Sequence, residues 1–70
     1  MANKSVREHV SRAIASRRFV LGWSQAELGA KVGVSRQAVD QWERGQTMPT
    51  YETLEALSQA FDCLPSELLP

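Results

Sequence analysis

The sequence predicts an all-α fold, a compact bundle of five short helices that forms one domain over residues 1–70. Apolar residues recur at helical spacing along the whole chain, and no stretch shows the period-two alternation of a β-strand. Ser and Thr precede the predicted helices and Gly follows several of them, as expected for helix caps. A length of 70 residues allows a single domain with a thin hydrophobic core.

The composition excludes several classes of protein. One Cys and one His can form neither an internal disulfide nor a Cys-based metal cluster, so we expect no metal and no cofactor. Apolar runs reach only three residues, too few to cross a membrane, and no signal-peptide pattern opens the chain. No pairing of a nucleophile with a base supports an enzyme. We therefore expect a cytoplasmic protein that is not an enzyme.

The first predicted helix covers residues 5–20. Ser5 and Glu8 form an S-x-x-E capping box, in which both side chains satisfy backbone N–H groups at a helix start. Gly22 marks the end of this helix, because glycine adopts the left-handed conformation without strain. The apolar face of the helix comprises Val6, Val10, Ala13 and Ile14.

Two shorter helices follow over residues 25–32 and 35–44, joined by a turn that contains Gly33. Helices joined by so short a turn cross steeply instead of packing side by side. Gly29 provides the small residue that a close crossing requires, and Gly33 provides a positive φ in the turn. The apolar residues expected to fill the space between the two helices are Leu28, Val32, Val39 and Trp42.

The last two predicted helices lie after the loop at residues 46–49. Thr50 caps a helix that ends at Phe61, and Pro65 suits the first position of a short fifth helix. One short terminal helix cannot easily bury three leucines. Leu64, Leu68 and Leu69 therefore either close the core or form a dimer contact.

The stretch from Ser24 to Gly45 reads SQAELGAKVGVSRQAVDQWERG. Its small residues, turn glycine and apolar positions resemble the helix-turn-helix of lambda-repressor-like regulators, the Xre or Cro/repressor family. The resemblance covers roughly residues 10–69. It implies a DNA-binding domain whose second motif helix enters the major groove of double-stranded DNA.

Carried onto this chain, the resemblance places Arg36, Gln37 and Gln41 at the base edges. The chemistry fits, because Arg can donate two hydrogen bonds to guanine and Gln can pair with adenine. Outside this motif, the same residues would be interpreted as an ordinary solvated helix face. The expected phosphate contacts lie at helix starts, after the reading helix and on the first helix; they are Ser24, Gln25, Ser35, Arg44, Gln46, Thr47 and Arg17.

The resemblance assigns a different role to Arg18. The family pairs an arginine at this position with a glutamate that matches Glu43. We therefore expect a structural salt bridge between Arg18 and Glu43 that links the first helix to the third.

These residues predict a sequence-specific transcription regulator, a phage-type or Cro-like repressor that binds a palindromic operator as a homodimer. An alternative is an antitoxin that binds a toxin and represses its own operon. The chain is either a repressor of the short type or a fragment of a longer one.

The net charge of zero hides a difference between the two halves. Residues 1–36 carry seven basic and two acidic side chains, whereas residues 37–70 carry one basic and six acidic ones. The predicted molecule therefore has a basic front and an acidic rear. The loop after the third helix lacks Lys and Arg, so we expect weak non-specific affinity for DNA.

Overall fold

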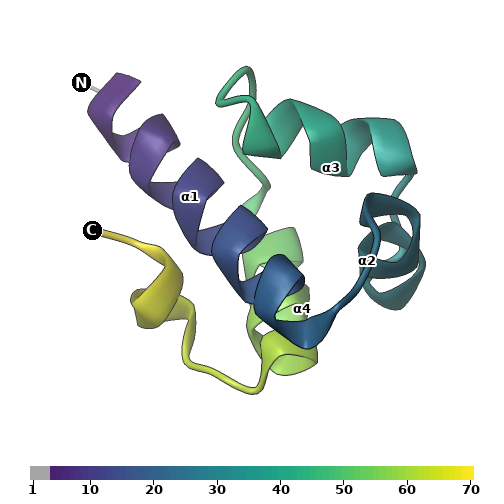
Figure 1. Ribbon diagram of the computed structural model, residues 1–70. Coiled ribbons are helices and arrows are strands. Elements are labelled where there is room, and N and C mark those ends of the chain that lie inside the picture. Colours follow the sequence, from purple (N-terminus) through teal and green to yellow (C-terminus); the bar gives the residue numbers. More distant parts are fainter. Residues whose placement is uncertain (1–3) are drawn as a thin grey trace.

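The computed structural model describes residues 4–70, which form four α-helices and one 3-10 helix (Figure 1). No strand occurs within these residues, so the all-α prediction holds for them. The last segment, yellow in Figure 1, returns toward α1. The elements are α1 (Lys4–Leu21), α2 (Gln25–Val32), α3 (Arg36–Glu43), α4 (Tyr51–Phe61) and η1 (Pro65–Leu68).

The expected fifth α-helix is wrong, because Pro65–Leu68 forms a single 3-10 turn, η1. Its N-cap residue, Leu64, has no polar side chain, and the cap is formed instead by Glu67 Oε2, which accepts from the Leu64 N–H at 2.8 Å. Four residues leave no room for the run of i to i−4 hydrogen bonds that makes an α-helix cooperative.

The predicted helix starts are confirmed in three cases and wrong in one. Ser24, Ser35 and Thr50 each accept a hydrogen bond from the backbone N–H three residues later, at 3.0, 3.1 and 3.2 Å. Ser5 does not begin α1, because the helix already includes Lys4. The capping box predicted at Ser5 is therefore incorrect.

The core lies where all five elements meet, and nine apolar side chains are buried in it. Trp42 is 6% exposed, which confirms that it packs inside the fold. Trp23 stacks on Phe61 with ring centroids 6.1 Å apart, and this contact closes the end of the core between α2 and α4. The buried set is Val10, Ile14, Leu28, Val39, Trp42, Leu54, Leu57, Phe61 and Leu68.

The turn between α2 and α3 requires glycine at two positions for different reasons. Gly33 has a φ of 78°, a conformation that other residues adopt only with strain. A Cβ at Gly29 would lie 2.7 Å from the carbonyl oxygen of Val34, which is too close for any side chain. The close approach predicted at Gly29 is therefore present, but it is made by the backbone of the turn. Figure 1 shows the outcome, with α2 viewed nearly along its axis and α3 lying across the view.

Candidate nucleic-acid interface

The side chains predicted to contact bases lie on the solvent side of α3. Arg36 and Gln37 are exposed and Gln41 is half-buried. Gln37 and Gln41 stand four residues apart, so they follow one another along the same side of the helix. Ser35 precedes them, and its hydroxyl oxygen caps α3. The arrangement presents one guanidinium and two amides on a continuous surface, which is the chemistry that base edges require.

The start of α2 lies beside this surface and is fixed by a reciprocal cap. Glu27 N–H donates to Ser24 Oγ at 3.0 Å, and Ser24 N–H donates to Glu27 Oε1 at 2.7 Å. Gln25 follows directly, and its amide oxygen accepts from Arg36 Nη1 at 3.1 Å. The structure therefore brings the predicted phosphate contact Gln25, which directly follows Ser24, to the predicted base contact Arg36.

Arg18 and Glu43 form the ion pair that the family resemblance implies. Arg18 Nε lies 2.7 Å from Glu43 Oε2, and Arg18 Nη2 donates to Glu43 Oε1 at 2.9 Å. The third nitrogen, Nη1, donates to the carbonyl of Trp23 at 2.8 Å. The hydrogen bonds to Glu43 raise the pKa of Arg18 despite its partial burial. All three nitrogens of this guanidinium thus donate hydrogen bonds within the protein.

Two further side chains of α1, which sequence reasoning missed, hold the same end of α3. Ser11 Oγ donates to the carbonyl of Glu43, and Arg7 Nε donates to the carbonyl of Gly45 at 3.1 Å. Together with Arg18 they form what we call the α1 clamp. Their positions could have been recognised, because residues 7, 11 and 18 share one helix face with Ile14, which is buried.

Asp40 lies at the centre of a second network of hydrogen bonds, which was not expected from the sequence. Its Oδ1 accepts from Gln25 Nε2 at 3.2 Å and its Oδ2 accepts from Arg44 Nε at 2.8 Å. The hydrogen bond from Gln25 lowers the pKa of Asp40, and Arg44 lowers it further. Gln25 Nε2 also donates to Glu43 Oε1 at 3.1 Å, which joins this network to the α1 clamp.

The remaining predicted contacts lie in two places. Gln46 and Thr47 are exposed in the loop after α3, next to Arg44. Arg17 lies on another side of α1, where its Nη2 is 3.4 Å from Glu67 Oε1 of η1. The structure therefore gathers the α2 and α3 residues and the loop, but it does not bring Arg17 to them.

The three terminal leucines have different environments. Leu68 is fully buried and closes the core, so it is unavailable for a dimer contact in this conformation. Leu69 packs partly against the core, whereas Leu64 is 64% exposed. Only Leu64 keeps the surface position that a contact between subunits would need.

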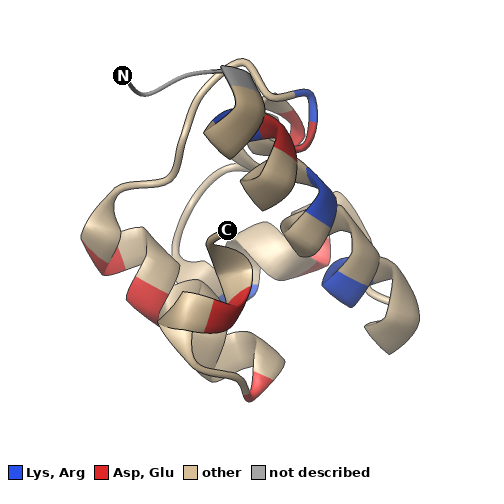
Figure 2. Cartoon of the chain, turned by 90° about the vertical axis from the view of Figure 1, so that its left-hand side faces the viewer, with Lys and Arg blue, Asp and Glu red and all other residues tan. Residues whose placement is uncertain are grey.

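The charges are arranged as the sequence halves predict, with one exception. Figure 2 shows acidic segments gathered on α4 and the C-terminal turn, with basic segments along α1. The exception is α3, which carries both Asp40 and Glu43. Each is paired with an arginine, Asp40 with Arg44 and Glu43 with Arg18. The front of the molecule is therefore less basic than the totals for the two halves suggest.

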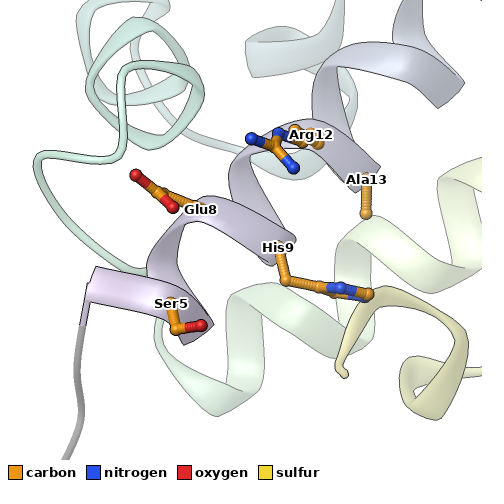
Figure 3. A pocket seen from close by; sticks show the side chains of 5 residues that line it. All are labelled: Ser5, Glu8, His9, Arg12 and Ala13. Atoms are coloured by element: carbon orange, nitrogen blue, oxygen red, sulfur yellow. The ribbon is translucent and has the colours of Figure 1, made fainter.

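The hollows in the surface are open and shallow. The one in Figure 3 measures about 460 Å³ and is lined by α1 alone. Within residues 4–70, no cluster of His, Cys, Asp and Glu is placed to hold a metal ion, and no helix is both long and apolar enough to span a bilayer. The residues that line the hollow are Ser5, Glu8, His9, Arg12 and Ala13.

The comparisons with known proteins agree with this geometry. The model of the helix-turn-helix family matches residues 20–68. Repressor protein C2 of Salmonella phage P22 is 52% identical over 56 residues, which are 80% of this chain and 26% of that protein. The HTH-type transcriptional regulator DicA of Escherichia coli K12 is 37% identical over 60 residues, which are 86% of this chain and 44% of that protein.

A solved structure gives the same result for the fold. The crystal structure of the P22 c2 repressor in complex with a synthetic operator superposes with a TM-score of 0.83 at 48% identity. The match covers 86% of this chain and 91% of that one. The chain spans about a quarter of the P22 repressor sequence and less than half of DicA. With its two motif helices, its turn glycines and its Arg18–Glu43 pair, the chain belongs to the lambda-repressor-like helix-turn-helix family.

Proposed function

We propose that this chain is a sequence-specific DNA-binding transcription regulator, a repressor that acts on DNA in the cytoplasm. The observation that carries the proposal is the surface of α3, where Arg36, Gln37 and Gln41 lie beside the capped start of α2. A P22 c2 repressor with this fold is seen in complex with operator DNA, which supports the same docking here. The names of both relatives, a repressor and a transcriptional regulator, favour this function over that of a toxin-binding antitoxin.

In this proposal α3 lies in the major groove and α2 crosses the backbone. Arg36, Gln37 and Gln41 then contact base edges, and the start of α2 contacts a phosphate through its backbone N–H groups. The other strand is contacted by the end of α3 and the loop that follows it, through Arg44, Gln46 and Thr47.

We further propose that two copies bind a palindromic operator. Two-fold symmetry would place the two α3 helices about one turn of DNA, ~34 Å, apart. Leu64 is the exposed apolar residue on the C-terminal segment that a dimer contact can use. Inserting about five base pairs between the half-sites moves one copy to the opposite side of the duplex, so cooperative binding should then be lost.

The test of base reading starts from operator sequences selected from a random duplex library. Gln37→Ala and Gln41→Ala should each relax the preference at one position by about 1–3 kcal/mol. Gln59→Ala is the matched control, because Gln59 is an exposed glutamine on α4. Unchanged sequence preference in both α3 variants would show that the base-reading residues lie elsewhere. No preference of the wild-type protein for any duplex would overturn the proposed function.

A further inference from the structure

Three charged residues form a row along α3 that alternates in sign. Arg36, Asp40 and Arg44 follow each other at four-residue spacing, so they occupy successive turns of one helix side. The carboxylate in the middle is fully engaged, since one oxygen accepts from Gln25 at 3.2 Å and the other from Arg44 at 2.8 Å. Arg36 is linked to Asp40 through the Gln25 side chain, because it donates to the amide oxygen whose amide nitrogen donates to Asp40.

This row has a consequence for phosphate binding. Gln25 and Arg44 are residues for which the sequence predicts phosphate contacts, and the side chains of both already donate to an anion of this chain. A phosphate oxygen would compete with the Asp40 carboxylate for the same N–H groups. The carboxylate would also repel the phosphate, because like charges at close range are unfavourable.

Building on the proposed function, we infer that Asp40 is an internal counter-anion that weakens the phosphate-based, sequence-independent part of DNA binding. Sequence-independent affinity comes from cations that neutralise phosphates and release counter-ions. An arginine held by Asp40 contributes less to that affinity than a free one. Within residues 4–70, the donors to the Asp40 carboxylate are Gln25 and Arg44, and neither Gln37 nor Gln41 donates to it, so contacts of these two glutamines with the bases are not weakened in the same way.

Asp40 can serve in this way because it stays ionised. Its hydrogen bond from Gln25 and its pairing with Arg44 hold the pKa of the carboxyl below its usual range. The Asp40 side chain is 27% exposed and the Arg44 side chain 65% exposed, so arriving DNA can reach the pair.

The test compares Asp40→Asn with Asp62→Asn. Both variants remove one negative charge, but Asp62 is an exposed residue after α4 with a φ of 57°, a conformation that asparagine tolerates well. Affinity for a non-specific duplex is measured by fluorescence anisotropy between roughly 50 and 200 mM salt. We expect D40N to bind about five to ten times more tightly at low salt. Its plot of log affinity against log salt should be steeper by about 0.9.

The D62N control and a double variant test whether any gain in affinity comes from releasing Arg44. D62N should change the slope little, and Arg44→Gln in the D40N background should remove the gain. Affinity for the operator should rise in D40N by a similar factor, because the same phosphate contacts form in both complexes. Equal slopes for D40N and D62N, with sequence-specific binding intact, would overturn this inference alone. Loss of all DNA binding by the wild-type protein would overturn the proposed function as well.

A readout that needs no DNA tests the contact directly. In the free protein, the Arg44 Nε–Hε proton should exchange with water more slowly than in D40N, as followed by NMR. Equal exchange in the two proteins would show that Asp40 does not hold Arg44, and the inference would fail.

Discussion

Arg18 and Glu43 are joined by two parallel hydrogen bonds, 2.7 and 2.9 Å long, that tie α1 to the end of α3. The side chains are only 19% and 9% exposed, so water screens the pair weakly. Arg18→Met would leave the Glu43 carboxylate without its main partner in a largely buried site. We expect the free energy of unfolding to fall by about 2 kcal/mol, measured by urea denaturation.

Arg17→Met provides the matched control for that variant. Arg17 pairs with Glu67 at 3.4 Å, and their side chains are 35% and 48% exposed. Removing an exposed pair should cost about 0.5 kcal/mol or less. Equal losses in the two variants would contradict the structural role of Arg18.

Gly29→Ala should destabilise the protein although alanine favours helix. The gain in helix propensity is about 1 kcal/mol, but the new Cβ would lie 2.7 Å from a backbone oxygen that cannot move freely. We expect a net loss of about 2 kcal/mol in thermal unfolding. Ala30→Gly, at an exposed position of α2, reports the propensity effect alone and should cost about 1 kcal/mol. A G29A protein more stable than wild type would show that the turn can relax.

The two roles considered for the terminal leucines can be separated by two truncations. Leu68→Ala empties a fully buried site and should cost about 3 kcal/mol. Leu64→Ala removes an exposed side chain and should change stability by about 0.5 kcal/mol or less. We expect L64A, but not a surface control such as Tyr51→Ala, to weaken self-association in sedimentation velocity. Unchanged association in L64A would place the dimer contact elsewhere.

Cys63 should make stability depend on alkaline pH. Burial raises the pKa of its thiol above the ordinary value, so the folded state disfavours the thiolate. The stability linked to this group is fully present below the pKa of the unfolded thiol, about 8.5, and is lost as pH rises through the higher folded value. Denaturation of wild type and Cys63→Ala should therefore give curves that converge or cross only above that pH. Parallel curves up to strongly alkaline pH would contradict the shift.

Local sequence patterns were sufficient to predict contacts between residues that are close together in the sequence. Ser24, Ser35 and Thr50 were recognised as caps because capping is decided within four residues. The same reasoning gave a wrong cap at Ser5. Its sequence pattern matches that of Ser24, but the helix starts one residue earlier, at Lys4. The 3-10 turn at Pro65–Leu68 depends on length and on packing of Leu68, neither of which is visible in a local pattern.

Contacts between distant segments were harder to predict. The Arg18–Glu43 pair was expected only through the family resemblance, and the two residues are 25 positions apart. Arg7 and Ser11 share the helix face of Ile14, which indicates that they face the protein, but they donate to backbone carbonyls, which every residue possesses, so the sequence does not identify their partners. The role of Asp40 depends on the side chains that donate to it, Gln25 from another helix and Arg44 from the next turn, and the contact with Gln25 is not visible in a local pattern.

The α1 clamp separates the residues that hold α3 from the residues that α3 presents to solvent. Arg7, Ser11 and Arg18 grip the backbone of Glu43 and Gly45 and the Glu43 carboxylate. Gln37 and Gln41 have no part in that grip. Substitutions at Gln37 and Gln41 therefore leave the contacts that hold α3 in place. A lineage built on this architecture can diverge in its targets while its scaffold stays the same.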